Sequence, residues 1–301
     1  MPTPAEVLDH HLGGFDTRDP DAVIEACEQA RDRLLANPSR HGSLVQLPDR
    51  GRLIVTGDLH DNTLNLARVL HFADLDQHED RHLVLHEVIH GPNLVNGRDL
   101  SIRMLAQCAR LVTRYPDRVH VLQSNHELAQ MLGDAVTKSG TDMNQAFIDG
   151  AHMVYPSAGD AVLEAANGYI RAMLLAVRAP NGLLAAHSLP WPKRLGEFDP
   201  GVLHRAVTDD DLRSGGSAHQ LVWGRRHDDT LADHLGAAWE VTSFLLGHQK
   251  AEMGWFREGK KILVIASDHN HGVCLPVDLS EPADVGQYAD QLHPLNSVLL
   301  G

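Results

Sequence analysis

The sequence predicts an α/β fold, because a short apolar run, a polar loop and a helical pattern follow one another three times in its first half. Strand–loop–helix units of this kind are typical of a sheet with parallel strands. Hairpin signals dominate the second half, and no Ser/Gly-rich or charged linker separates the two halves. We therefore expect a single domain over 1–301, with a helical extension at 1–50, a core at 52–279 and a tail at 280–301.

The first 50 residues are expected to be mostly helical. Asp19 or Asp21 can cap a helix that continues to Leu35, since apolar residues recur in this segment at helical spacing. Asn37 and Pro38 follow, and a proline at that place ends a helix.

Three buried strands, each too short for a helix, are expected in the first half at 52–56, 82–85 and 119–122. A helical pattern follows each strand, and the second of these helices should run from about Leu100 to Tyr115. Polar residues stand between strand and helix, where open α/β sheets bind their ligands. These residues are Asp58 and His60, then His86 and Glu87, then Asn125 and His126.

The second half is expected to begin with helix and loop over 137–167 and to continue as strands. Apolar runs at 171–178 and 183–187 are joined through Asn181-Gly182, and Asn-Gly is the strongest short signal for a hairpin. The further expected strands are 243–247, 255–257, 261–266 and 272–277. His187 and His248 fall at the ends of two of these runs and so repeat the pattern of the first half.

Composition excludes several classes of protein. The chain has 26 Lys and Arg against 40 Asp and Glu, a net charge of −14, and no basic block. It therefore lacks the clustered cations that hold a nucleic-acid backbone. No apolar run approaches the roughly 20 residues of a membrane span. We expect neither a nucleic acid nor a membrane as a partner.

The expected compartment is the cytoplasm. The first residues lack the basic start and apolar stretch of a signal peptide. Cys27, Cys108 and Cys274 form no CxxC pair, and their odd number argues against a disulfide framework. Histidine is abundant, with 21 in 301 residues, and supplies potential metal ligands and proton carriers.

The polar residues at the strand ends are of the types that bind divalent metals. Carboxylate and amide oxygens suit hard cations, and imidazole suits Zn, Fe and Mn. Asp58 and His60, two residues apart on an extended segment, point to the same side and can share one metal. A two-metal site needs a carboxylate that bridges the ions. Glu87 is a candidate bridge, and the candidates to complete the second ion are Asn125, His187 and His248.

These residues lie in segments that resemble motifs of the calcineurin-like metallophosphoesterases, most closely the serine/threonine phosphoprotein phosphatase branch. The resemblance spans roughly Arg52 to Leu279. Gly57-Asp58-Leu59-His60 is similar to the GDxH block of that family, and Ser124-Asn125-His126-Glu127 to its GNHE block. The segments that resemble its HGGLSP sequence and its last ligand histidine are 186–190 and 247–255.

The resemblance implies two mixed β-sheets flanked by helices in a four-layer sandwich, with a dinuclear metal site at the strand ends. One metal would be held by Asp58, His60 and Glu87, and the other by Glu87, Asn125, His187 and His248. The two divalent ions would be Mn, Fe, Zn or Mg, with Mn favoured, and a hydroxide that bridges them would attack phosphorus. His126 would be the general acid that protonates the leaving group.

The chain also departs from the family's sequence. Glu87 replaces the bridging Asp, and His86 precedes it where the family has Gly. In the family's GDxxDRG block, the Asp that orients the proton donor is replaced here by His90, and the substrate-binding Arg is absent. The candidates for substrate binding are Arg225, Arg226, His90 and His271.

Three hypotheses follow. The first is a metal-dependent phosphomonoesterase of phosphoprotein-phosphatase-like type, whose substrate is a phosphoprotein or a small phosphoester. The second keeps the two metals but takes a dinucleoside polyphosphate or a cyclic nucleotide. The third is a catalytically weak scaffold with the same fold, which the altered GDxxDRG block motivates.

Overall fold

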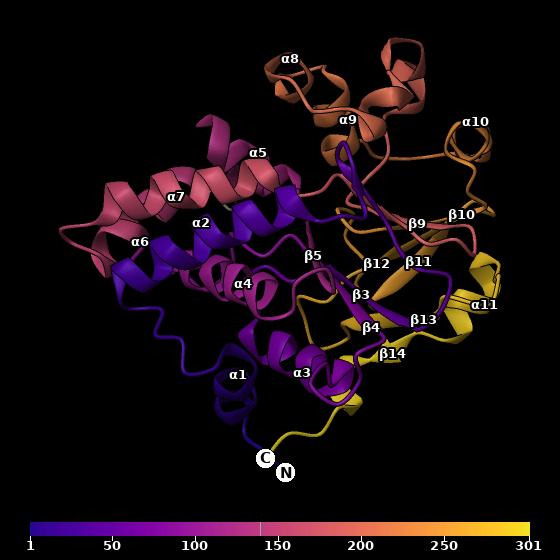
Figure 1. Cartoon of the computed structure of the whole chain (residues 1–301). Coiled ribbons are helices and arrows are strands. Elements are labelled where there is room, and N and C mark those ends of the chain that lie inside the picture. The colour runs from indigo at the N-terminus through magenta and orange to yellow at the C-terminus, as the bar shows by residue number, and fades with distance from the viewer. Residues whose placement is uncertain (139) are drawn as a thin grey trace.

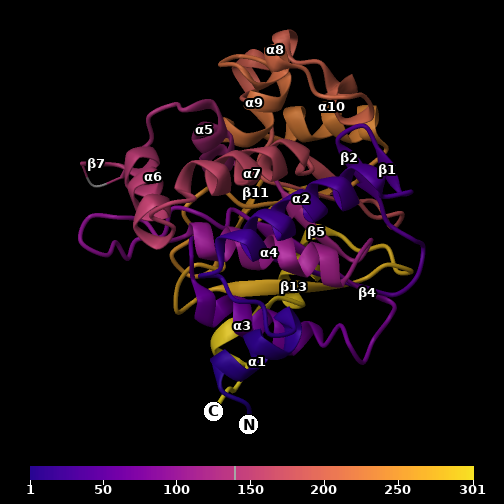
Figure 2. The ribbon, with the colours of Figure 1, turned by 60° about the vertical axis from the view of Figure 1, so that its left-hand side comes forward.

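The computed structural model describes residues 1–138 and 140–301, which form two β-sheets with helices on their outer faces (Figures 1 and 2). The five-stranded sheet has the order β14 (His293–Pro294), β13 (Val273–Asp278), β3 (Arg52–Asp58), β4 (Arg81–His86), β5 (Val119–Leu122). The seven-stranded sheet has the order β1 (Arg40–His41), β2 (Leu44–Gln46), β8 (Ala176–Arg178), β9 (Leu183–Ala186), β10 (Ser243–Leu246), β12 (Ile262–Ile265), β11 (Trp255–Glu258). A short ribbon pairs β6 (Thr137–Lys138) with β7 (Thr141–Asp142). Both large sheets combine parallel and antiparallel pairs, so the predicted fold class is confirmed.

Helices cover the outer face of each sheet. Those that share a core with the five-stranded sheet are α1 (Pro4–Leu12), α2 (Pro20–Ala36), α3 (Thr63–Ala73), α4 (Ile102–Arg114), α6 (Met143–Val154) and α7 (Gly159–Ala172). Those on the seven-stranded sheet are α8 (Asp209–Leu212), α9 (Ser217–Trp223) and α10 (Asp229–Trp239), with the 3₁₀ turns η1 (Pro192–Glu197) and η2 (Pro200–His204) nearby. The remaining elements are α5 (Asn125–Leu132), which contacts both α7 and α9, α11 (Val285–Asp290) beside β12, and the 3₁₀ turn η3 (Leu295–Ser297). None of the helices in the described part of the chain is long and apolar enough to cross a membrane.

Side chains alternate along the strands between an outer core and a core between the sheets. In β4, Leu83 and Leu85 pack under the helices, whereas Val84 lies between the two sheets. In β10, Leu246 packs toward α9 and α10 and Leu245 lies between the sheets. The molecule is therefore four layers deep, in the order helices, sheet, sheet, helices.

Parallel strands bring several strand ends to one edge. β3, β4 and β5 are parallel neighbours, and so are β9, β10 and β12. An isolated bridge between Asp58 and Ala266 links the end of β3 to the end of β12, so the carboxyl ends of both sheets meet there. The register of β3 against β4 shifts between Val55 and Asp58, and this irregularity sets Asp58 opposite His86.

The expected elements are mostly present, but some differ in detail. Asp19, rather than Asp21, caps α2, and its carboxylate accepts two backbone N–H groups. The expected strand at 171–178 is wrong in its first part, because α7 continues to Ala172 and only Ala176–Arg178 pairs with β9. The segment at 1–50 also contains β1 and β2, which were not expected.

Candidate metal centre

The six predicted metal ligands all lie at the edge where the two sheets meet. Asp58 is the last residue of β3, and Glu87 directly follows β4. His60 comes two residues after β3, Asn125 opens α5, and His187 and His248 follow β9 and β10. Each position follows from a strand that ends at the same edge, which is where α/β sheets place ligand-binding side chains.

His187 lies at the centre of the group. Its Nε2 is 2.9 Å from Asn125 Oδ1 and 3.2 Å from His248 Nδ1. Its Nδ1 is 3.6 Å from Asp58 Oδ1, and its Nε2 is 3.8 Å from Glu87 Oε1. The carboxylate of Glu87 also faces His60, whose Nε2 lies 3.3 Å from Glu87 Oε2. The structure thus brings together residues from both halves of the chain.

The backbone around these ligands is held in an uncommon conformation. His60, Glu87 and His248 have positive φ angles of 43°, 37° and 65°, and none of them is glycine. Such angles cost energy and persist where the surrounding structure enforces them. The backbone N–H of His248 donates to both carboxylate oxygens of Asp58, each at 3.0 Å, which fixes that carboxylate.

Glu127, which the sequence analysis did not assign, holds the loop after β4. Its Oε1 accepts the backbone N–H groups of Val88 at 2.8 Å and Ile89 at 3.2 Å. Ser124 Oγ donates to Glu87 Oε1 at 3.0 Å and also bonds Glu127. A glutamate directly after Asn125-His126 was the available signal, because it is the last position of the GNHE-like block.

Burial shifts the pKa values of the carboxylates and imidazoles in this group toward their neutral forms. Burial, and then the charge of Glu87, raises the pKa of Asp58 well above its ordinary value. Burial, and then the charge of Glu127, raises the pKa of Glu87 to about 7. Burial also lowers the pKa of His187, and it lowers that of His248 to about 3 with help from Arg225. Neutral imidazoles beside buried carboxylates are the donor set of a divalent transition metal, so the residues present fit such an ion.

The ligand atoms form two groups of three, and within each group all atoms lie within 4.8 Å of one another. The inner group is Asp58, His86 and His187, and all three residues are buried. The outer group is His60, Glu87 and His126, of which His60 and His126 are half-buried.

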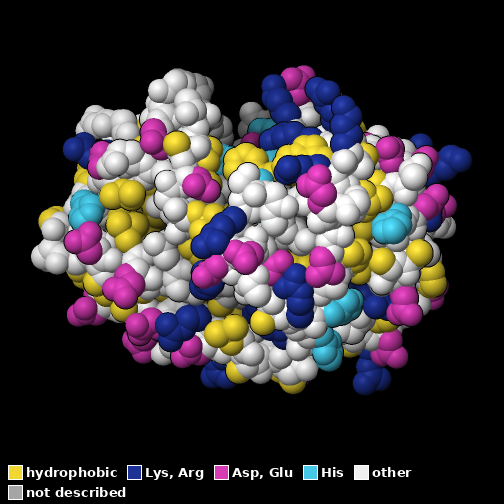
Figure 3. All heavy atoms as spheres, turned by 90° about the horizontal axis from the view of Figure 1, so that it is seen from above, with side chains coloured by type: hydrophobic (Ala, Val, Ile, Leu, Met, Phe, Trp, Pro, Cys, Tyr) yellow, Lys and Arg dark blue, Asp and Glu magenta, His cyan; other side chains and the backbone are white. Residues whose placement is uncertain are grey.

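A pocket of about 390 Å³ opens onto the outer group. The potential ligands and proton donor that line it are Asp58, His60, Glu87, Asn125, His126 and His248. Arg225 and Lys250 line it as well and bring cationic groups to its edge, next to His269, Glu252 and Asp268. In the view from above, Lys and Arg side chains gather on one side of a hollow in which histidines are visible (Figure 3).

The four predicted substrate residues have different positions. Arg225 is exposed, lines the pocket, and donates from Nη1 to the carbonyl oxygen of His248 at 3.3 Å. Arg226 and His271 are exposed and do not line this pocket. His90 is fully buried, and its Nδ1 lies 2.9 Å from Asp99 Oδ2. Its ring is 5.2 Å from that of His126, so it lies behind the pocket wall.

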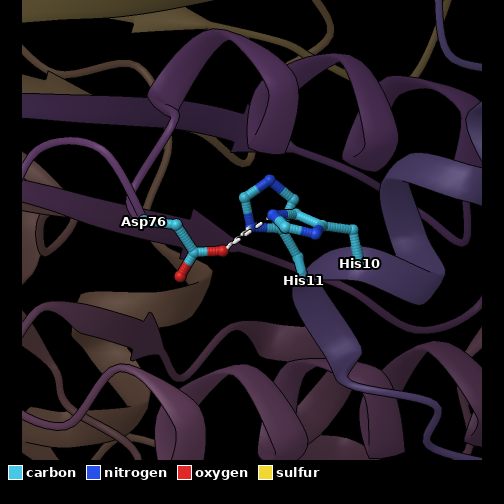
Figure 4. Close-up of side chains that lie close together, drawn as sticks. All are labelled: His10, His11 and Asp76. Atoms are coloured by element: carbon cyan, nitrogen blue, oxygen red, sulfur yellow. Dashed lines mark ion pairs between the residues drawn. The ribbon is translucent and has the colours of Figure 1, made fainter.

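A further cluster of His10, His11 and Asp76 lies away from this site (Figure 4). His10 Nε2 is 2.9 Å from Asp76 Oδ2, and His11 Nδ1 is 2.8 Å from the hydroxyl of Tyr115. Arg114 also reaches Asp76 at 3.4 Å. The carboxylate of Asp76 is thus shared among His10, His11 and Arg114, and the cluster is explained as the contact that holds α1 to the loop after α3.

No protein-family model and no curated protein sequence match this chain. Solved structures do match it. A serine/threonine phosphatase from Saccharomyces cerevisiae, with similarity to human phosphatase PP5, superposes with a TM-score of 0.61 at 14% identity, over 86% of this chain and 83% of that one. A cold-active protein-tyrosine phosphatase of Shewanella superposes with a TM-score of 0.57 at 16% identity, over 85% and 83%. The fold that the resemblance implies is therefore confirmed, because this chain shares it with solved protein phosphatases.

Proposed function

We propose that this protein is a metal-dependent phosphoester hydrolase, and that it acts on phosphomonoesters in the manner of a phosphoprotein phosphatase. The observation that supports this most is the convergence of six metal-type side chains, from both sheets, at one edge, where five of them line one pocket and His187 lies buried beside them. His187 Nδ1 and His248 Nε2 are buried there and have no hydrogen-bond partner among the described residues. Side chains that only stabilise loops would be paired.

The proposed ligand sets remain those implied by the sequence. Asp58, His60 and Glu87 would hold one divalent ion, and Glu87 with Asn125, His187 and His248 the other. When bound, such ions supply an activated water and neutralise phosphoryl oxygens. Among Mn, Fe, Zn and Mg we favour Mn, and we place the protein in the cytoplasm.

We assign the role of general acid to His126. Its side chain is 14% exposed in the pocket, so it can reach a bound substrate. The rings of His60 and His90 each lie 5.2 Å from its ring and restrict its orientation. A leaving alkoxide needs a proton, and a positioned imidazole can supply it.

Arg225 is the proposed phosphate-binding cation. Guanidinium binds phosphate oxygens bidentately, and Arg225 is the one predicted substrate residue that lines the pocket among those the structure describes. Its contact with the carbonyl of His248 places the guanidinium next to the proposed ligands. The substrate would be a phosphoprotein or a small phosphoester.

The test is hydrolysis of a substrate panel by metal-loaded protein: an aryl phosphate, a phosphopeptide, a dinucleoside polyphosphate and a cyclic nucleotide. Asp58→Asn should lower kcat/KM for the aryl phosphate by at least about 100-fold. It replaces a proposed metal ligand and weakens the hydrogen bond that the His248 N–H donates to the Asp58 carboxylate. Asp76→Asn, far from the pocket, is the control. Activity confined to the diester or polyphosphate would favour the nucleotide hypothesis. Less than one metal per chain would favour the scaffold.

A further inference from the structure

His86 is a buried histidine that the proposed pair of ligand sets does not use. It ends β4 and is 0% exposed. A buried polar side chain normally has a hydrogen-bond partner, so a buried side chain without one needs an explanation.

The strand geometry directs the His86 imidazole into the space between the two sheets. Leu85 packs under the helices and Val84 lies between the sheets, so alternation returns His86 to the side of Val84. The register shift in β3 sets Asp58 opposite His86 on the adjacent parallel strand. His187 follows Ala186, which packs outward, and therefore also faces the layer between the sheets.

The contacts of His86 leave its nitrogens available. Neither Nδ1 nor Nε2 has a hydrogen-bond partner among the residues that the structure describes. A ring nitrogen lies within 4.8 Å of ligand atoms of both Asp58 and His187. Gly247 provides the room, since a Cβ there would lie 3.1 Å from His86 Nδ1 and would collide with Asp58.

We propose that His86 is a metal ligand and that it forms an inner binding position with Asp58 and His187, so that these two residues share one ion instead of belonging to the two separate ligand sets given above. This inference rests on the proposed function, because it assumes that the pocket binds divalent metal. Two imidazoles and one carboxylate form a nitrogen-rich set, which favours Zn, Fe or Co over Mg. The outer position, built on Glu87, then differs in chemistry from the inner one.

The experiment compares His86→Leu with His120→Leu in metal-free protein titrated with Co(II). His120 is the matched control because it is equally buried, on the adjacent strand β5, and contacts only His82 among the described polar partners. His86→Leu should lower the affinity of the tighter Co(II) position at least about tenfold and weaken its visible absorption. It should also raise the Tm of the metal-free protein, because it removes two unpaired buried nitrogens. His120→Leu should leave Co(II) binding unchanged.

The outcomes separate this inference from the proposed function. If His86→Leu binds Co(II) with wild-type affinity and spectrum while the wild type hydrolyses phosphoesters, His86 is not a ligand and the proposed function stands. A wild type that binds no metal overturns both. If His86→Leu does not fold, ¹¹³Cd–¹H correlation spectra of the wild type decide. Coupling from ¹¹³Cd to the His86 ring protons is expected, and its absence overturns the inference.

Discussion

The loop after β4 stabilises its own backbone through a buried pair, His90 and Asp99. Asp99 Oδ2 lies 2.9 Å from His90 Nδ1, and Asp99 Oδ1 accepts the backbone N–H of Ser101 at 2.9 Å. Ser101 Oγ in turn accepts the backbone N–H of His90 at 3.0 Å. This set of bonds closes the loop behind His126.

Asp99→Ala should therefore destabilise the protein. The substitution leaves the buried Ser101 N–H without its acceptor and removes the contact with the His90 ring, and an unsatisfied buried group costs about 1–3 kcal/mol. Urea unfolding of the metal-free protein measures the difference in the free energy of unfolding. Asp149→Ala, which removes an exposed carboxylate bonded to Gln145 on α6, should change that free energy by less than about 0.5 kcal/mol. Equal effects of the two would contradict the role given to Asp99.

Arg225 and Arg226 are adjacent but should respond differently to substitution. Arg225→Met removes a guanidinium that lines the pocket, so we expect KM for an aryl phosphate to rise about tenfold or more. Arg226→Met alters an exposed side chain outside the pocket lining and should have a smaller effect on KM. Steady-state kinetics of both variants decide the order, and a larger effect at Arg226 would move the phosphate-binding role to that residue.

At the scale of elements, the close approach of β10 to β3 depends on one glycine. Gly247 follows β10, and a Cβ at this position would collide with Asp58 and crowd His86. Gly247→Ala should displace the Asp58 carboxylate and lower both metal stoichiometry and hydrolysis. Gly196→Ala is the control, because nothing lies within 4 Å of a Cβ there. Normal metal content in Gly247→Ala, measured by elemental analysis, would contradict this prediction.

The elements that the sequence predicted correctly are those whose pattern is local. β3, β4 and β5 are apolar runs bounded by polar residues, and the Asn181-Gly182 turn does join β8 to β9. β1 and β2 have only two and three residues, and β2 pairs with β8 from a distant part of the chain as well as with β1, so their length was too short for local patterning to indicate them. The apolar run at 171–178 has the pattern of one strand. Its first two residues nevertheless belong to α7, which ends at Ala172.

The sequence predicts those site residues that are metal-type side chains directly at the end of an apolar run. Asp58 and His187 are polar residues at the ends of apolar runs, so their positions followed from the sequence. The inner position that includes His86 could not be predicted from the sequence. It depends on the register shift in β3 and on the way in which the two sheets pack face to face. Glu127 was missed for a similar reason: its partners, Val88 and Ile89, are backbone groups of another loop.

At the scale of the whole molecule, the helices and strands of residues 1–50 are part of the main core, whereas an N-terminal extension would only pack on its surface. α2 packs against α4 and α7, and β2 pairs with β8 at the edge of the seven-stranded sheet. Val23, Cys27 and Ala30 of α2 are fully buried. We therefore predict that removal of residues 1–50 prevents cooperative folding, as measured by circular dichroism and thermal unfolding. Removal of residues 1–3 alone should leave the melting transition in place.

The stability of the whole molecule should depend on pH through histidines that lie away from the metal centre. Burial lowers the pKa of His11 and His82 to about 4 and that of His120 to about 3, against an ordinary value of 6.5. Between these values and pH 6.5 the unfolded chain binds protons that the folded chain does not. The free energy of unfolding must therefore rise with pH in this range and fall on acidification.

His120 tests this dependence because the contribution of one histidine can be isolated. His120→Leu removes one proton-binding difference, so its free energy of unfolding should change less steeply with pH than that of the wild type. The difference in slope should approach about 1.4 kcal/mol per pH unit between pH 4 and 6, the value for one proton. Urea unfolding of both proteins in the presence of a chelator, at several pH values, measures the two slopes. Parallel curves would mean that His120 is protonated in the folded state, and that the layer between the sheets at that end is open to water.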